Sequence, residues 1–272
     1  MNNNIEKTLD VNKRQKDFYN FKNINRKNLP TRIWSGLRNG LLNDFRQEFE
    51  IKDKVYRQHK IWLGDLSQKK VLDLGCLRGN SLSIYMAKNA KEYIGIDLSD
   101  IAIKCLNRLL IEEKCKNAKG VAIDFLSPDF TDSNFDVIYA YGVLHHFENF
   151  DFLISRLNDK LETGGEIISY DPLQTSLPVK TIRSIYRPFQ SDKDWEWPFK
   201  KSTLKKIHQN FKIIDKKGIL GKSKYGFFIN LLPINKVKKK KIINDLVNKD
   251  WNLKNINDSY VCMHITMLLK KM

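Results

Sequence analysis

The sequence of 272 residues predicts an α/β fold with a mostly parallel seven-stranded sheet and helices on both faces. Short apolar runs alternate with amphipathic helical segments between Lys70 and Asp171, which is the pattern of βαβ units. The run from Phe135 to Tyr141 is apolar on both faces, as expected for a buried parallel strand. Thr163-Gly164-Gly165 then gives the helix-end and turn signal that precedes a further strand.

The expected elements follow one another in a regular order. The apolar runs indicate strands at residues 71–74, 93–97, 120–124, 135–141 and 166–170. Helices are expected between them at residues 80–88, 100–113 and 150–161. A short helix at residues 202–209 leads to two final strands at residues 211–220 and 261–269.

Three further segments flank or interrupt this core. Residues 1–64 have a polar, helical pattern, and we expect them to form an N-terminal helical lid on a main domain of residues 65–272. Residues 173–201 combine prolines with aromatic residues, which indicates an insertion over the sheet edge. Residues 222–258 form a second insertion, which contains the lysine-rich run from Lys236 to Lys241.

The chain carries a strong positive charge. Its 48 Lys and Arg residues against 31 Asp and Glu residues give a net charge of +17, which favours an anionic partner such as nucleic acid, a membrane surface or a phosphorylated substrate. The N-terminus lacks the apolar core of a signal peptide, and no apolar stretch approaches the roughly 20 residues of a membrane-spanning helix. The four cysteines are scattered without a CxxC pair, so we expect reduced thiols, no metal site and a cytoplasmic location.

The turn after the first strand is a candidate ligand site, because ligands of open parallel sheets bind where the strands end. Gly75 lets the backbone turn sharply, and Gly79 lets the following helix pack close to the strand. The segment lacks the GxGxxG spacing, so a dinucleotide site is poorly supported.

Carboxylates mark the same edge of the predicted sheet. Asp73 precedes the turn, Asp97 ends the second strand, and Asp124 ends the third. Any one of them alone is better explained by an ordinary helix cap or turn. Three at the ends of successive strands are better explained by one shared ligand, with Asp97 placed to accept both hydroxyls of a ribose.

These motifs together resemble class I S-adenosylmethionine-dependent methyltransferases, which have a Rossmann-like fold. The first motif of that family, Asp-x-Gly-x-Gly-x-Gly after a strand, matches Asp73, Gly75 and Gly79. Leu77 stands where the family usually has the middle glycine, so a side chain there is expected to crowd the methionine portion of the cofactor or to shift the turn.

The remaining motifs occur in the family's order. Asp97 matches the second motif, and Asp124-Phe125 matches the third. Residues 135–147 resemble the fourth-strand segment, and residues 161–165 resemble the helix end before the fifth strand. The resemblance therefore covers residues 70–171, near the middle of the chain.

The resemblance implies S-adenosylmethionine as cofactor and S-adenosylhomocysteine as its product. It places Asp97 at the ribose, Asp124 with Phe125 at the adenine, and Tyr141 beside the methionine portion. Phe18-Tyr19 and Trp34 of the lid are expected to close over the cofactor or to pack as ordinary core. The full set of expected cofactor-binding residues is Tyr19, Asp73, Gly75, Cys76, Gly79, Asp97, Leu98, Asp124, Phe125 and Tyr141.

Two histidines are the candidate catalytic residues. Methyl transfer depends on alignment and on exclusion of water, and a hydroxyl acceptor also benefits from a base. His145 and His146 follow the fourth strand, and histidine has the pKa range of a base. The family often has a backbone-fixing histidine at the place of His146, so His145 is the better candidate to face the acceptor. A structural role for either histidine stays an alternative.

The resemblance favours O-methylation of a small molecule, and the segments outside the core leave its character open between anionic and aromatic. Arg183 and Arg187, four residues apart, suit a carboxylate or phosphate, or a solvated face. The run Lys236 to Lys241 beside apolar residues 226–232 suits an anionic membrane, RNA or solvent. Two alternatives remain: an RNA methyltransferase, favoured by charge alone, and a non-catalytic cofactor-binding homologue, kept open by Leu77.

Overall fold

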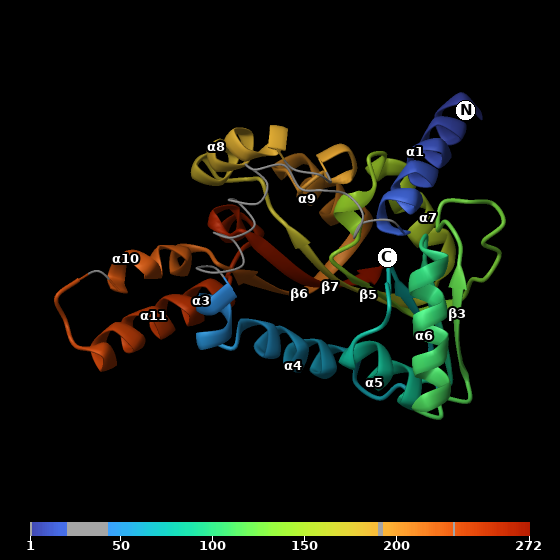
Figure 1. The fold of residues 1–272 in the computed structure, drawn as a ribbon, viewed down its shortest axis with the longest axis horizontal. Helices are drawn as coiled ribbons and strands as arrows, with labels where there is room; N and C mark the ends of the chain where they lie inside the picture. The colour runs from blue at the N-terminus through green and yellow to red at the C-terminus, as the bar shows by residue number, and fades with distance from the viewer. Residues whose placement is uncertain (1, 21–42, 190–192, 231) are drawn as a thin grey trace.

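The computed structural model describes residues 2–20, 43–189, 193–230 and 232–272 (Figure 1). At its centre is a seven-stranded sheet with the order β3-β2-β1-β4-β5-β7-β6, in which β7 alone runs antiparallel to its neighbours. The strands are β1 (Lys70–Leu74), β2 (Glu92–Asp97), β3 (Ala118–Ala122), β4 (Phe135–Tyr141), β5 (Leu161–Pro172), β6 (Phe211–Ile219) and β7 (His264–Lys271). The predicted mostly parallel α/β sheet is confirmed.

The strand order reverses beside β1. The chain moves from β1 outward through β2 to β3, and then returns to place β4 on the other side of β1. The connections that leave the carboxyl ends of β1 and β4 therefore diverge, and this opens a crevice at that edge. The fold thus positions a ligand site at the turns that follow these two strands.

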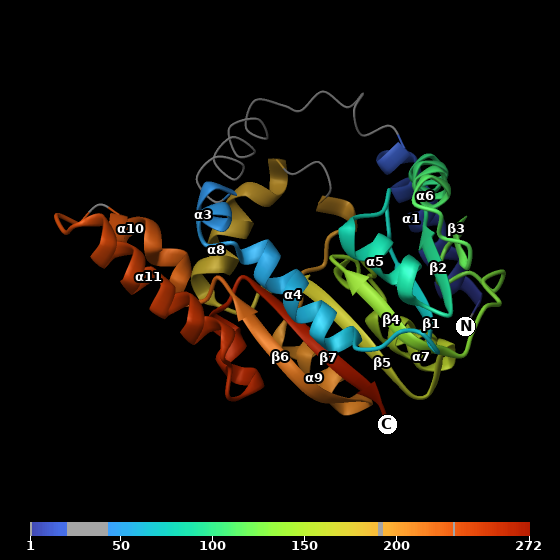
Figure 2. The same ribbon diagram turned by 90° about the horizontal axis from the view of Figure 1, so that it is seen from below.

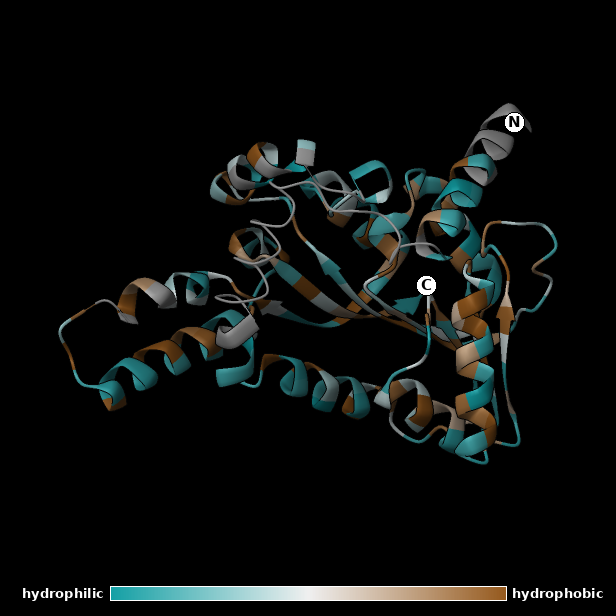
Figure 3. Cartoon of the chain, in the orientation of Figure 1, coloured by the Kyte–Doolittle hydropathy of each residue, from teal (hydrophilic) through white to brown (hydrophobic). Residues whose placement is uncertain are grey.

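Helices cover both faces of the sheet (Figure 2). Along β1 the side chains alternate, so that Val71 packs on one face and Leu72 on the other. The first face is covered by α4 (Ile51–Leu63), α5 (Ser81–Asn89) and α6 (Asp100–Glu112). The second face is covered by α7 (Phe150–Lys160) and α9 (Lys201–Asn210). Figure 3 shows apolar and polar residues alternating along α6, as a helix with one buried side requires.

Polar side chains begin three of these helices at the carboxyl edge. The Asn80 side chain accepts hydrogen bonds from the N–H groups of Leu82 and Ser83 at the start of α5. Ser99 caps α6, and Asn149 caps α7, in the same way. Because these caps satisfy backbone donors that have no partner within the helix, they fix where each helix leaves its strand.

The segments outside the core are helical. The N-terminal part forms α1 (Asn2–Asn20) and α3 (Asn43–Glu48). The segment after β5 forms α8 (Leu177–Tyr186) and two 3-10 turns, Arg187–Phe189 and Lys193–Trp195. Between β6 and β7 lie α10 (Gly226–Asn230), α11 (Lys236–Trp251) and the 3-10 segments Lys222–Tyr225 and Ile256–Val261. Figure 1 shows α10 and α11 projecting away from the sheet, with the lysine-rich run at the start of α11. Within the described ranges, no helix has the length and apolar character needed to cross a membrane.

Some predicted boundaries were wrong. The third strand ends at Ala122 rather than at Asp124, because Asp124 begins a turn in which its side chain accepts a hydrogen bond of 2.9 Å from the N–H of Leu126. Strand β5 starts already at Leu161 and runs through the expected turn, where Gly164 has a φ of 74°. The N-terminal helix α1 runs from Asn2 to Asn20, within the segment for which the sequence indicated helical structure.

A buried histidine joins α4 to the sheet. His59 Nε2 lies 2.7 Å from Thr266 Oγ1, and the Thr266 hydroxyl donates to the carbonyl of Ser169. The Nε2 nitrogen must therefore donate to Thr266, and His59 Nδ1 accepts from the Tyr139 hydroxyl at 3.0 Å. Burial lowers the pKa of His59 to about 3, so the ring is neutral in the folded protein.

This histidine makes stability depend on pH. Its pKa is about 3 when folded and 6.5 as the ordinary value, so the unfolded chain takes up the proton first as the pH falls. The contribution of neutral His59 to the free energy of unfolding is therefore fully present above pH 6.5, and it is lost as the pH falls toward 3. We expect the decline between about pH 7.5 and about pH 5 to be about 2 kcal/mol smaller in His59→Gln than in the wild type. Urea unfolding at the two pH values measures this, and equal declines in both proteins would contradict it.

Candidate active site

The turn after β1 brings the backbone against the segment that follows β4. Gly75 has a φ of 68°, and a Cβ atom there would lie 2.5 Å from Val143 Cγ2. The N–H groups of Gly75 and Cys76 both donate to the carbonyl of Ile96, at 2.8 and 3.1 Å. Gly79 has a φ of 78°, and its Cβ would lie 2.8 Å from Leu106 Cδ1. Both positions thus require glycine, for backbone conformation and for space.

Leu77 keeps the conformation that glycine favours. Its φ is 49°, in the left-handed region, and its side chain is 49% exposed. Its N–H donates to Asp97 Oδ2 at 3.0 Å. The leucine therefore leaves the turn intact at a cost of about 1–2 kcal/mol of backbone strain.

Asp97 is held at the end of β2 by backbone donors on both of its oxygens. Oδ1 accepts from the N–H of Ser99 at 2.9 Å, and Oδ2 accepts from Leu77. Burial raises the pKa of Asp97, and these N–H groups oppose the rise by stabilising the carboxylate. The carboxylate is thus fixed in orientation at the rim of the crevice.

The crevice contains a cavity of about 320 Å³, which lies in the size range of small-molecule sites. Its walls combine residues from β1, β2 and β4, the segments that follow these strands and β3, and helices α1 and α4. Lining residues from the predicted set are Gly75, Cys76, Gly79, Asp97, Leu98, Asp124, Phe125, Tyr141 and His146. Its size, the glycine turn and the anchored Asp97 fit a nucleoside-bearing ligand.

Asp73 lies beneath the turn rather than on the cavity wall. It is 2% exposed, and its Oδ2 accepts from the hydroxyls of Ser83 and Tyr93, both at 2.7 Å. Burial raises its pKa to about 6, and these two hydrogen bonds act in the opposite direction. Asp73 thereby ties β1 to α5 and β2 and supports the turn from below.

Helix α1 supplies two cavity residues that sequence reasoning missed. Asn12 and Gln15 are buried and line the cavity, and Asn12 Nδ2 donates to Asp124 Oδ2 at 2.8 Å. Neither belongs to a motif, and only their spacing on one face of a helix is a sequence signal for them. The side chain of Tyr19 and all of Trp34 lie outside the described residues.

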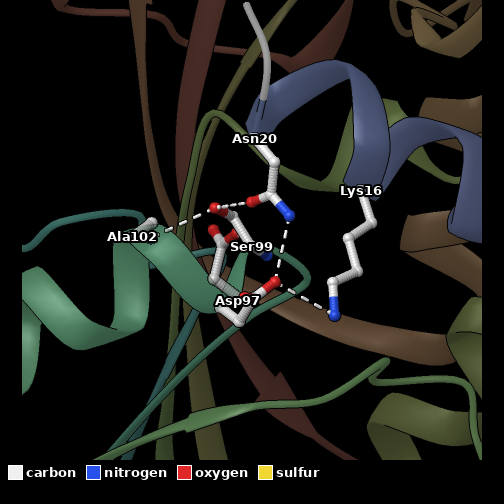
Figure 4. Close-up of polar contacts among 6 residues, drawn as sticks. Lys16, Asn20, Asp97, Ser99 and Ala102 are labelled. Carbon is white, nitrogen blue, oxygen red and sulfur yellow. Dashed lines mark hydrogen bonds and ion pairs between the residues drawn. The ribbon is translucent and has the colours of Figure 1, made fainter.

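The end of α1 is attached beside Asp97, at the start of α6 (Figure 4). The Ser99 hydroxyl donates to Asn20 Oδ1 at 2.6 Å, and Asn20 Nδ2 donates to Asp100 at 3.0 Å. Lys16 adds an ion pair of 3.1 Å with Asp100. These contacts hold the end of α1 beside Asp97, while Asn12 holds the middle of the helix beside Asp124.

The two histidines occupy different positions. His145 is buried, and its Nδ1–H donates to Asp171 Oδ1 at 2.9 Å. His146 lines the cavity, and its Nδ1 lies 2.6 Å from the carbonyl oxygen of Trp195. Because a carbonyl only accepts, Nδ1 of His146 carries the hydrogen, and Nε2 is the basic nitrogen of the neutral ring. The structure thus places His146, rather than His145, on the cavity wall.

Leu77 generates a stability prediction. We expect Leu77→Gly to raise the free energy of unfolding by roughly 0.5 kcal/mol, because relief of the left-handed strain exceeds the entropy that glycine adds to the unfolded chain. Ile111→Gly is the matched control, since Ile111 is 78% exposed in α6 and replacement of an isoleucine by glycine in a helix costs about 0.5 kcal/mol. Urea unfolding compares the two, and equal destabilisation by both substitutions would contradict the assignment of strain.

Comparison with known proteins agrees with this geometry. A family model described as a methyltransferase domain matches residues 44–213. An uncharacterized protein of Haemophilus influenzae is 36% identical over 112 residues, which are 39% of this chain and 43% of that protein. A tRNA U34 carboxymethyltransferase of Shewanella woodyi is 33% identical over 110 residues, which are 39% of this chain and 32% of that protein. The chain thus matches less than half the length of these curated relatives.

Solved structures show the same fold. The N-methyltransferase NodS from Bradyrhizobium japonicum, in complex with S-adenosylhomocysteine, aligns with a TM-score of 0.51 and 13% identity. The alignment covers 82% of this chain and 87% of NodS. With a family model that matches more than half of the sequence, the chain belongs to the methyltransferase-domain family and has the fold of class I S-adenosylmethionine-dependent methyltransferases.

Proposed function

We propose that the protein binds S-adenosylmethionine in the cavity and directs methylation of an oxygen atom on a small-molecule acceptor. The observation that carries this proposal is a single cavity whose lining includes the glycine turn, Asp97 and His146. When bound, the cofactor supplies a methyl group on a positively charged sulfur that is already a good leaving group. The chain's own work is therefore to orient the two partners and to exclude water.

Asp97 and Asp124, whose carboxylates are held by hydrogen bonds, define the side of the cavity proposed for the cofactor. Asp97 accepts the ribose hydroxyls with a carboxylate that two backbone N–H groups already orient. Asp124 and Phe125 hold the adenine, with α1 as the lid through Asn12. Asp73 is a positioning residue in this proposal, because its carboxylate is engaged by Ser83 and Tyr93 beneath the turn.

His146 is the proposed base. Its Nε2 takes the proton of the acceptor hydroxyl, and the hydrogen bond from Nδ1 to the Trp195 carbonyl stabilises the ring once it is charged. His145 packs against it, with ring centroids 4.2 Å apart, and is itself held by Asp171. We therefore assign His145 to positioning His146, which reverses the preference that the sequence suggested.

An RNA acceptor is the second candidate. It is supported by the net charge of +17 and by curated relatives named as tRNA U34 carboxymethyltransferases over the matched segment. It predicts RNA binding whose affinity falls steeply with salt, because each neutralised phosphate releases counterions. A non-catalytic homologue would instead bind the cofactor and methylate nothing.

A methyl-transfer screen separates these functions. Labelled S-adenosylmethionine is supplied with the protein to separate pools of cell metabolites, lipids and RNA. We expect label in the metabolite pool. Label in RNA alone would establish the second candidate, and cofactor binding without any transfer would establish the non-catalytic one.

His146 generates a kinetic prediction. With the acceptor found in the screen, we expect His146→Gln to lower kcat by about 10²–10⁴-fold, because general-base catalysis contributes that much. Affinity for S-adenosylhomocysteine should stay close to wild type, which controls for folding. His145→Gln should lower kcat less and shift its pH profile, through misplacement of His146. A kcat of His146→Gln equal to wild type across the pH range would refute the base.

A further inference from the structure

A row of stacked rings leads away from the cavity along the carboxyl edge of the sheet. Tyr141 ends β4 and lines the cavity, and its ring stacks on Tyr170 of β5 with centroids 4.6 Å apart and an interplanar angle of 9°. Tyr170 stacks in turn on His264, the first residue of β7, at 5.4 Å and 18°. The strand register explains the row, because Tyr141 pairs with Tyr170, while Thr266, the partner of Tyr170, shares a face with His264.

Arg46 of α3 lies near this row, and its charge acts on all three rings. Its Nε atom is fully buried and has no hydrogen-bond acceptor, and among the side chains that the structure describes Arg46 has no ion pair. Burial raises the pKa of Tyr170 to about 12, and the positive charge of Arg46 opposes that rise. Arg46 acts in the same direction on the pKa of Tyr141, which burial also raises, and it adds to the lowering of the His264 pKa by burial.

Arg46 and the two tyrosine hydroxyls at this edge are hydrogen-bond donors. Because their pKa values are raised, the Tyr141 and Tyr170 hydroxyls keep their protons at neutral pH, and neither has a hydrogen-bond partner in the described part of the chain. Arg183 of α8 adds a second positive charge near His264, and Figure 1 shows α3 and α8 on opposite sides of the start of β7. The carboxylate of Asp171 belongs to the other face of β5, where it is bonded to His145.

Arg46 and the hydroxyls of Tyr141 and Tyr170 lack a hydrogen-bond acceptor among the described residues. The Nε atom of Arg46 is buried without an acceptor, and a buried donor is unfavourable unless an acceptor accompanies it. A planar guanidinium matches the two oxygens of a carboxylate or phosphate, and phenol hydroxyls can donate to the same oxygens. The protein supplies the donors here, and no described acceptor meets them.

We propose that the acceptor carries an anionic oxygen group, a carboxylate or a phosphate, which Arg46 binds together with the hydroxyls of Tyr141 and Tyr170. The inference rests on the proposed function, because Tyr141 joins this anion site to the cofactor cavity. An acceptor anchored at Arg46 and lying along the aromatic row directs its other end toward Tyr141 and the cavity. The anionic group thereby selects the acceptor and sets its orientation.

Binding of small probes to the protein saturated with S-adenosylhomocysteine tests this. Benzoate and phenyl phosphate are the anionic probes, and benzamide is the neutral counterpart of benzoate. Calorimetry should show that the wild type binds at least one anion more tightly than benzamide. Arg46→Gln should weaken binding of that anion by about tenfold or more, and Tyr170→Phe should weaken it less. Arg57→Gln is the matched control, because Arg57 is an exposed arginine paired with Glu50.

The outcomes separate this inference from the proposed function. A wild-type protein that binds no S-adenosylhomocysteine would refute the function. Normal binding of S-adenosylhomocysteine with equal affinity for anions and benzamide, or with anion binding that survives Arg46→Gln, would overturn the anion site alone. Should Arg46→Gln fail to fold, Arg46→Lys keeps the charge without the planar fork and should retain a weakened preference for the anion, as should Tyr170→Phe. An unweakened preference in both variants would contradict the proposal.

Discussion

The cavity depends on the turn after β1. Gly75 permits contact with Val143, and Leu77, held in the left-handed conformation, presents its N–H to Asp97. Together with the hydrogen bonds from the N–H groups of Gly75 and Cys76 to the carbonyl of Ile96, this hydrogen bond joins the end of β2 to the turn of β1. Asp73, buried beneath, fixes the same turn from below through Ser83 and Tyr93. The residues with the strongest motif signal therefore shape the cavity as much as they line it.

The two sides of the proposed site differ in charge, so the net charge of +17 does not describe the charge at the site itself. Carboxylates, Asp97 and Asp124, lie on the proposed cofactor side, where ribose and adenine offer hydrogen-bond donors. Arg46 and the tyrosine hydroxyls lie on the proposed acceptor side. The lysine-rich run is on α11, which projects from the sheet (Figure 1). In the proposed site, the charges that bear on the acceptor are therefore those of Arg46 and Arg183 near the aromatic row, rather than the net charge of the chain.

Much of the fold was predictable because its determinants are local. Apolar runs and helical spacing identified the strands, and strand ends identified Asp97 and the glycine turn. Asn12 was not predictable, since it reaches Asp124 across 112 residues without a motif. Choosing between His145 and His146 required the 3-10 turn Leu144–His146, which directs two adjacent rings to different partners. Arg46 was not predictable either, because only the folded structure shows that its buried Nε atom has no acceptor among the described residues.

Calorimetric titration of the protein with S-adenosylhomocysteine tests the central claim most directly. The proposed function predicts one saturable site per chain, with affinity reduced about tenfold or more in Asp97→Ala, because a charged hydrogen-bond acceptor for the ribose is lost. Absence of binding to the folded wild-type protein, or binding that Asp97→Ala leaves unchanged, would contradict it.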